Sequence, residues 1–179
     1  MAVSANTIWE VRIDGNNTNG GGFVAGASGT DWSQQAAAQY SVTDGVTAGT
    51  TTITSASANF GTDVVGNIMY VQGGTGSVAA GWYQITVRNS STSVTVDRST
   101  GLTAGTGVTL IIGGALLSPA IGCSLGATIG QICFVKYSAS AFSITTASAN
   151  VAGGCLNMTQ GTIICGYDTT RTLTNTDAN

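Results

Sequence analysis

Histidine is absent from the 179-residue sequence, and charged side chains make up only 7% of it. Histidine is the usual general base near neutral pH and a frequent metal ligand, so its absence argues against catalytic triads and most metal centres. The five basic residues are scattered rather than clustered: Arg12, Arg88, Arg98, Lys136 and Arg171. Binding to a phosphate backbone needs several cations on one face, so we expect no nucleic-acid partner. We also expect no cofactor and no metal.

The first twenty residues have neither a basic start nor an apolar segment, so we expect no signal peptide. No residue between Arg98 and Lys136 is charged, and the run is long enough to suggest a membrane span. Closely spaced glycines, beginning with Gly113-Gly114, break this run, which fits turns between short buried strands better than a helix. We therefore expect synthesis in the cytoplasm and no membrane association.

Glycine, by contrast, is abundant, with 26 residues against a single proline, and 42% of the residues are hydrophobic. Such a composition, with long tracts of Thr, Ser, Ala and Val, favours strands and tight turns, so we predict an all-β fold. Residues 1–40 are expected to hold a strand within residues 3–13, followed by a Gly/Asn-rich loop. Asp31 is placed to cap a short helix that continues to Gln39, and at most this one short helix is expected.

We predict that residues 41–113 form a small antiparallel β module. Its five short strands are separated by clusters of Gly, Asn, Ser or Thr and cover Thr51–Thr54, Val64–Gln72, Trp82–Arg88, Ser93–Asp97 and Val108–Ile112. Side chains alternate cleanly in the third and fourth of them, which is typical of half-buried strands. Five strands at this spacing predict a small five-stranded β-barrel or sandwich, because closure hides the strand edges.

Residues 114–170 carry four cysteines with a repeated offset. Cys123 precedes Cys155 by thirty-two residues, and Cys133 precedes Cys165 by the same number. If each copy is one coil, neighbouring coils lie about 4.8 Å apart, so this part predicts about two rungs of a β-solenoid, a β-helix-like stack. The expected strands are Ile132–Lys136, Phe142–Thr146, Cys155–Met158 and Thr162–Cys165.

The sequence leaves the state of these cysteines open. Zinc sites favour ligand pairs two to four residues apart, so the spacing of ten within each copy argues against a metal site. Reduced, stacked cysteines are one alternative, typical of a protein made in a reducing cytosol. Disulfides Cys123–Cys155 and Cys133–Cys165 are the other, and each would stabilise the fold by on the order of 3–4 kcal/mol.

Acidic and aromatic residues give weak functional signals. The aspartates mostly stand beside Gly, Thr or Asn in expected turns, where a carboxylate caps the backbone. Glu10 lies in a strand near Arg12, so we predict a surface ion pair for it and no catalytic role. The aromatic residues are expected mainly in the core, with a weaker alternative in which four of them stack on a carbohydrate: Trp32, Trp82, Tyr83 and Tyr137.

Several runs of the chain resemble one group of viral proteins. They are WEVRIDGNNTNGGGFVAGASGTDWSQQAAAQY, DVVGNIMYVQGGTGSVAAGWYQITV, VTVDRSTG, GGALLSP and GYDTTRT. These runs are similar to the N-terminal region of tailed-phage virion proteins of the tail-fibre and decoration type, which continue into right-handed, pectin-lyase-like β-helices. The chain departs from that pattern because it stops after about two rungs and an extended C-terminal tail, residues 171–179.

The resemblance implies a non-enzymatic structural protein of a bacteriophage particle, located on the virion surface, capsid or tail, and made in the host cytoplasm. We expect a capsid decoration (cement) protein that forms a homo-oligomer, dimer or trimer, and contacts the major capsid protein or a tail protein. The alternative is a carbohydrate-binding adhesion module of the tail-fibre or tailspike type. A truncated polysaccharide-degrading enzyme is a weaker third hypothesis, because histidine is absent and the acids lie in turns.

Overall fold

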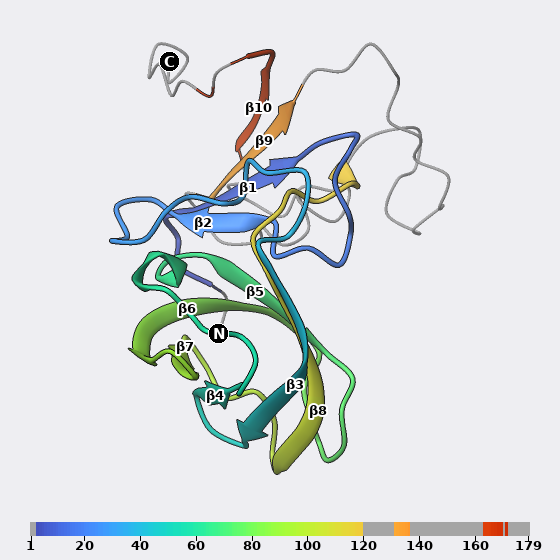
Figure 1. Ribbon diagram of the computed structural model, residues 1–179. Helices are drawn as coiled ribbons and strands as arrows, with labels where there is room; N and C mark the ends of the chain where they lie inside the picture. Colours follow the sequence, from blue (N-terminus) through green and yellow to red (C-terminus); the bar gives the residue numbers. More distant parts are fainter. Residues whose placement is uncertain (1–2, 120–130, 137–162, 170, 172–179) are drawn as a thin grey trace.

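Two β-sheets make up the fold in the computed structural model, which describes residues 3–119, 131–136, 163–169 and 171. A closed barrel lies in the lower part of Figure 1, with the second sheet above it. The all-β prediction is confirmed, and no helix in these ranges is long and apolar enough to cross a membrane. The elements in chain order are β1 (Thr7–Val11), β2 (Gly22–Val24), β3 (Tyr40–Ala48), β4 (Thr52–Thr54), the 3₁₀ helix η1 (Thr62–Val64), β5 (Ile68–Gln72), β6 (Gly81–Ser90), β7 (Ser93–Val96), β8 (Ala104–Ile112), β9 (Ile132–Lys136) and β10 (Ile163–Tyr167).

Six antiparallel strands close the barrel in the order β3-β4-β7-β6-β5-β8. Five of them overlap the predicted strands, so the barrel has one strand more than predicted. The sixth, β3, was not predicted because Asp44-Gly45 in its middle has the composition of a turn. Gly45 lies at a shift in the β3–β8 register, where a Cβ atom would stand 2.6 Å from the carbonyl oxygen of Val108. Glycine lets the two backbones approach, so the strand continues around the barrel instead of ending.

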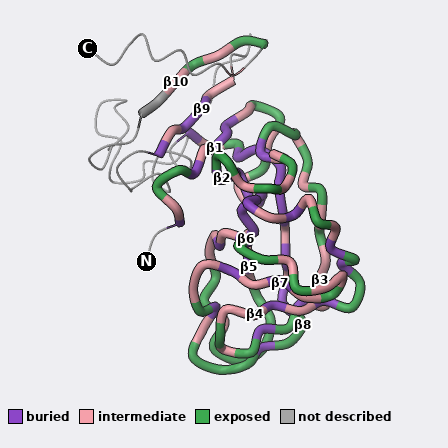
Figure 2. Tube along the Cα trace, turned by 90° about the vertical axis from the view of Figure 1, so that its left-hand side faces the viewer, coloured by how far each residue is buried: buried purple, intermediate pink, exposed green. Residues whose placement is uncertain are grey.

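Apolar side chains fill the interior of the barrel. In β8, Val108, Leu110 and Ile112 are fully buried, and the residues between them are half-buried, as the alternation of a strand requires. Phe60 and Val64, from the connection between β4 and β5, join the same core. Exposed residues are concentrated in the outer loops of the barrel (Figure 2). The barrel is therefore a packed core and offers no lumen for a ligand.

Residues 31–39 form turns and bends, so the predicted helix is wrong. Asp31 does cap a turn, because its Oδ1 accepts hydrogen bonds from the amide and hydroxyl groups of Ser33 at 2.9 and 2.6 Å. The carbonyl of Trp32, however, accepts from the amide of Gly114 at 3.0 Å rather than from a residue four positions on. Hydrogen bonds to the segment after β8 thus replace those of a helix.

The second sheet has the order β10-β9-β1-β2. β1, β9 and β10 run parallel to one another, and β2 is antiparallel to β1. β9 has the predicted bounds, and β10 overlaps the strand predicted at Thr162–Cys165. The predicted strands Phe142–Thr146 and Cys155–Met158 lie outside the described residues. Because β1 pairs with β9, the first forty residues and residues 114–170 contribute to one sheet.

A second apolar core lies beneath this sheet, and Trp9 is its largest side chain. The core consists of Val3, Trp9, Val11, Ile68, Leu116 and Cys133. Ile68 belongs to the barrel strand β5, so this core joins the sheet to the barrel. The indole nitrogen of Trp9 donates to the side-chain oxygen of Gln131 at 3.2 Å, which satisfies its only polar group.

Asn67 connects the loop before β3 to the barrel. Its side chain is fully buried: Oδ1 accepts from the amide of Trp32 (3.1 Å), and Nδ2 donates to the carbonyl of Thr30 (2.8 Å). The same Nδ2 lies 3.3 Å from the carbonyl of Val64. Replacing Asn67 by alanine would leave these groups unsatisfied, so we expect the free energy of unfolding to fall by about 2–3 kcal/mol. Urea unfolding followed by circular dichroism measures this loss.

Asn89→Ala is the matched control, because Asn89 is exposed and its amide donates to the side chains of Ser93 and Thr95. We expect this variant to stay within about 0.5 kcal/mol of the parent protein. Equal losses for the two variants would show that the buried network around Asn67 contributes nothing specific.

Candidate functional site

A group of charged and aromatic side chains lies on one face of the second sheet. Trp9 and Val11 face the second core, so Glu10 between them faces the opposite side of β1. The hydroxyl of Tyr167, on β10, donates to Oε1 of Glu10, and Nη1 of Arg171 lies 3.3 Å from Oε2. The side chain of Glu10 is fully buried, and only 7% of the Arg171 side chain is exposed.

Asp31 and Phe134 complete this group, which we call the Glu10–Arg171 cluster (Glu10, Asp31, Phe134, Tyr167 and Arg171). Nη2 of Arg171 donates to Oδ2 of Asp31. The guanidinium carbon of Arg171 also stands 5.2 Å from the ring centre of Phe134, within the range of a cation–π contact. The cluster therefore joins the loop after β2 to the three parallel strands.

Burial raises the pKa of Glu10 from 4.5 to about 7, because the ionised carboxylate loses its hydration. The hydrogen bond from Tyr167 and the positive charges of Arg171 and Arg12 oppose this rise, whereas the charge of Asp31 adds to it. Burial also raises the pKa of Tyr167, whose proton is held further by its hydrogen bond to Glu10. The carboxyl group of Glu10 therefore titrates near neutral pH, whereas the hydroxyl of Tyr167 stays protonated there.

A carboxyl group with a pKa near 7 is typical of catalytic sites. Here, however, the exposed fraction of Glu10 is 0%, and its two oxygens face Tyr167 and Arg171. The bond to Tyr167 spans 157 positions of the sequence. The arrangement is therefore suited to tying β10 to β1 across the strand β9 that lies between them, rather than to binding a substrate.

The predicted surface pair between Glu10 and Arg12 is wrong. Arg12 instead forms a bidentate pair with Asp14, in which both N–O distances are 2.8 Å. One signal in the sequence was the position of Glu10 between two apolar residues, Trp9 and Val11. These two neighbours face a core, so the side chain of Glu10 lies on the opposite face of the strand. Because that face is also covered, its carboxylate is buried. A buried carboxylate needs a partner, and with so few cations in the chain that partner could lie far away in sequence.

Asp44 shows the turn chemistry that the sequence predicts for the aspartates. Its oxygens accept hydrogen bonds from the hydroxyl of Ser55 (2.5 Å) and from the amide (2.9 Å) and hydroxyl (2.8 Å) of Ser57. These hydrogen bonds lower the pKa of Asp44 to about 2, and the bond from Ser55 has the largest effect. The carboxylate thus fastens β3 to the segment that follows β4.

The Glu10→Gln variant is expected to remove a pH dependence of stability. The pKa of Glu10 is higher in the folded protein than in the unfolded chain, so the folded state binds the proton more tightly. In the parent protein the free energy of unfolding should therefore fall as pH rises from 4.5 to 7, by about 3 kcal/mol in total. Glutamine stays neutral, so its variant should lose this decrease. Urea unfolding at a series of pH values provides the measurement.

Asp44→Asn serves as the control for that experiment. The pKa of Asp44 lies below the window, so its stabilising effect is lost only as pH falls from 3.8 through 2. This variant should keep the decrease between pH 4.5 and 7. A decrease of the same size in Glu10→Gln would show that another group is responsible.

Two of the four repeated cysteines, Cys123 and Cys155, lie outside the described residues. In the described strands, Cys133 of β9 stands opposite Ile164 of β10. This offset of thirty-one residues is one less than the cysteine repeat predicts, so Cys133 and Cys165 occupy neighbouring positions on opposite faces of the sheet. Cys133 is part of the second core, and Cys165 lies half-buried on the face of the Glu10–Arg171 cluster.

Three of the four residues predicted to stack on a carbohydrate are described in the structure: Trp32, Trp82 and Tyr83. The fourth, Tyr137, lies outside the described residues. The ring of Trp32 packs against Tyr40, with 5.5 Å between ring centres, and that of Trp82 against Tyr70, at 4.6 Å. Tyr83 is only 2% exposed and belongs to the barrel core. These three side chains therefore have packing roles.

Within the described ranges, no three Cys, Asp or Glu side chains come together as a metal site. Comparison with protein-family models, with curated proteins and with solved structures gives no match. Any function must therefore be inferred from the two sheets, the Glu10–Arg171 cluster and the runs of sequence quoted above.

Proposed function

We propose that this chain is a non-enzymatic structural protein of a bacteriophage particle and that it acts as a capsid decoration (cement) protein. The observation that carries the proposal is the parallel stack of β1, β9 and β10. Parallel strands from successive coils are the building pattern of β-solenoids. The phage virion proteins that the sequence resembles continue into such a fold.

The finer architecture proposed for residues 114–170 is about two rungs of a β-solenoid. The register of β9 and β10 supports it, because equivalent positions recur after thirty-one residues. A solenoid also needs a cap at each open end. The short antiparallel strand β2 ends the sheet on the side of β1, so the N-terminal unit supplies one cap (Figure 1).

The engagement of the acidic side chains supports a role without catalysis. Glu10 is buried and paired with Arg171, and Asp14 and Asp97 form ion pairs with neighbouring arginines. Such carboxylates are engaged within the fold and are not available as a general acid and base at one site. The protein would then act through contacts with its own copies, as a dimer or trimer, and with the major capsid protein.

A tail-fibre component is the second candidate function, and the same parallel stack favours it. A fibre shaft built as a β-helix would begin with strands that run in the direction of β9 and β10. In that case the chain would lie on the tail and contact a tail protein, and adhesion to a carbohydrate would be its role.

Deletion of the gene from the phage that encodes it separates these functions. For a decoration protein, particles without the chain should assemble and adsorb normally but release their DNA at a lower temperature, and adding the purified protein should restore heat stability. Heat-stable particles that fail to adsorb would instead assign the chain to the tail. Gradient-purified virions that contain none of the chain would contradict both functions.

A further inference from the structure

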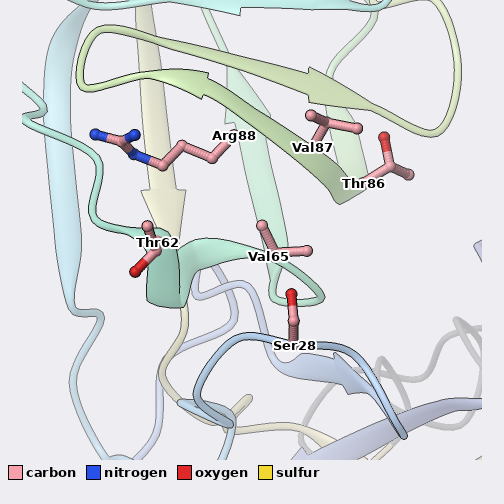
Figure 3. Close-up of a pocket in the computed structure, with 6 residues that line it drawn as sticks. All are labelled: Ser28, Thr62, Val65, Thr86, Val87 and Arg88. Carbon is pink, nitrogen blue, oxygen red and sulfur yellow. The ribbon is translucent and has the colours of Figure 1, made fainter.

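A shallow groove of about 340 Å³ crosses the outside of the barrel, between β6, the end of η1 and the loop after β2. Figure 3 shows its six lining residues: Ser28, Thr62, Val65, Thr86, Val87 and Arg88. Three of them carry hydroxyl groups and one carries a guanidinium, and none of the six is acidic. The groove therefore combines one positive charge with neutral hydrogen-bonding groups and two apolar side chains.

Arg88 differs from the other described arginines in having no acidic partner. Arg12, Arg98 and Arg171 each form an ion pair with a carboxylate, whereas Arg88 forms none with any residue that the structure describes. Its Nε donates to the carbonyl of Phe60 at 2.7 Å, which fixes the guanidinium. The four N–H groups on its two terminal nitrogens make no hydrogen bond in the same ranges. A fixed guanidinium with an unoccupied fork matches the two oxygens of a carboxylate.

A β-bulge adds an apolar side chain to the lining of the same groove. The register of β6 and β7 shifts between Ile85 and Val87, so Thr86 is an extra residue in β6. Regular alternation would direct Val87, like Ile85, into the barrel core. Instead Thr86 and Val87 are both exposed, and 49% of Val87 is accessible. Bulges of this kind often re-aim side chains at binding sites.

We propose that this groove, which we call the Arg88 groove, binds an acidic side chain of a partner protein. The carboxylate would pair with the fork of Arg88, and the aliphatic part of a Glu side chain would pack on Val87. The hydroxyls of Ser28 and Thr62, which make no hydrogen bond to any described residue, complete the set of donors.

Charge complementarity identifies the occupant. The lining holds a single cation, which suits one carboxylate and not a chain of phosphates. The open, partly apolar shape suits a segment of another protein's surface. The identity of the partner as a subunit of the same particle depends on the function proposed above. The preference of the groove for a carboxylate does not depend on that function.

The test is a titration of the purified, ¹⁵N-labelled chain with an acetylated hexaglutamate peptide, followed by NMR. The signals are the side-chain Nε–H of Arg88 in the parent protein and the backbone amides of Thr86 and Val87, which line the same groove, in the parent and every variant. We expect saturable shifts of these signals, and none with the corresponding hexaglutamine peptide. Arg88→Gln should weaken binding at least about fivefold, since it removes a charge-assisted hydrogen bond. The matched control is Lys136→Gln, which removes the same charge from β9, outside the groove, and should change the affinity less than about twofold.

Two variants at Val87 keep the test valid if Arg88→Gln does not fold. Val87 is half-exposed, so polar residues should be tolerated there. Val87→Asp should abolish binding of hexaglutamate by repulsion, and Val87→Lys should strengthen it. The proposal is overturned if no signal shifts, if Lys136→Gln weakens binding as much as Arg88→Gln, or if D-galacturonate saturates the groove and the peptide does not. The titration needs no phage particle, so its failure would leave the virion-surface role to be decided by the gene deletion.

Discussion

Replacing Trp9 by alanine is expected to lower the free energy of unfolding by about 3–5 kcal/mol. Trp9 is 0% exposed and is the largest side chain of the second core, where it packs with Ile68 and Leu116. The site cannot collapse readily around a cavity, because Gly22 and Ile68 are held by strand pairing on either side. The substitution also leaves the side chain of Gln131 without its hydrogen bond from the indole. Urea unfolding at neutral pH measures the loss.

Trp82→Ala is the control for this experiment, because Trp82 lies at the edge of the same core: it is only half-buried, its ring lies at a tilt against Tyr70, and its indole nitrogen donates to the carbonyl of Asn19 at 2.9 Å. Its loss should be about 1–2 kcal/mol. Hydrogen exchange in the Trp9→Ala variant should show faster exchange in β9, with the barrel strand β8 still protected. A loss no greater than that of Trp82→Ala would contradict the role of Trp9 as the centre of the second core.

The second large effect is expected for Arg171→Met, which removes the cation of the Glu10–Arg171 cluster. Breaking a buried ion pair from one side leaves an uncompensated carboxylate, so we expect a loss of about 3 kcal/mol at pH 8. At pH 5 the loss should be smaller, because burial raises the pKa of Glu10 to about 7 and the carboxyl group is then mostly protonated. Urea unfolding at the two pH values measures both losses.

Arg12→Met is the matched control, because it also replaces an arginine that pairs with an aspartate. In that pair half of the Asp14 side chain is exposed, at 51%, so the loss should be at most about 1 kcal/mol and similar at both pH values. An Arg171→Met loss that is the same at pH 5 and pH 8 would show that Glu10 does not titrate in the cluster.

Local pattern made most of the barrel predictable from the sequence. Strands such as β7 alternate strictly, with Val94 and Val96 buried and Thr95 between them half-buried, and short turns separate them. β3 could not be found in this way, because Gly45 serves close packing against β8 and not a turn. The helix expected from Asp31 failed for a related reason: its backbone groups bond to a distant segment, and a local pattern does not report such bonds.

The Glu10–Arg171 cluster could not be assembled from the sequence because its members lie far apart. Glu10 meets Tyr167 only because β1 pairs in parallel with β9, and β9 with β10. Parallel pairing leaves no local signal of a partner's identity. The cysteine repeat did point to neighbouring coils, but the register found between β9 and β10 differs from it by one residue. One residue is enough to move a side chain to the other face.

A cryo-EM map of the phage particle that we propose contains this chain would show whether its copies lie on the capsid or on the tail. The decoration function predicts copies on the outside of the capsid at its symmetry axes, each bridging neighbouring capsid subunits, with the edge of the second sheet in a contact. Copies along the shaft or at the tip of the tail would contradict that function and favour the fibre role. A map in which no density fits the six-stranded barrel would contradict the structural role in the virion altogether.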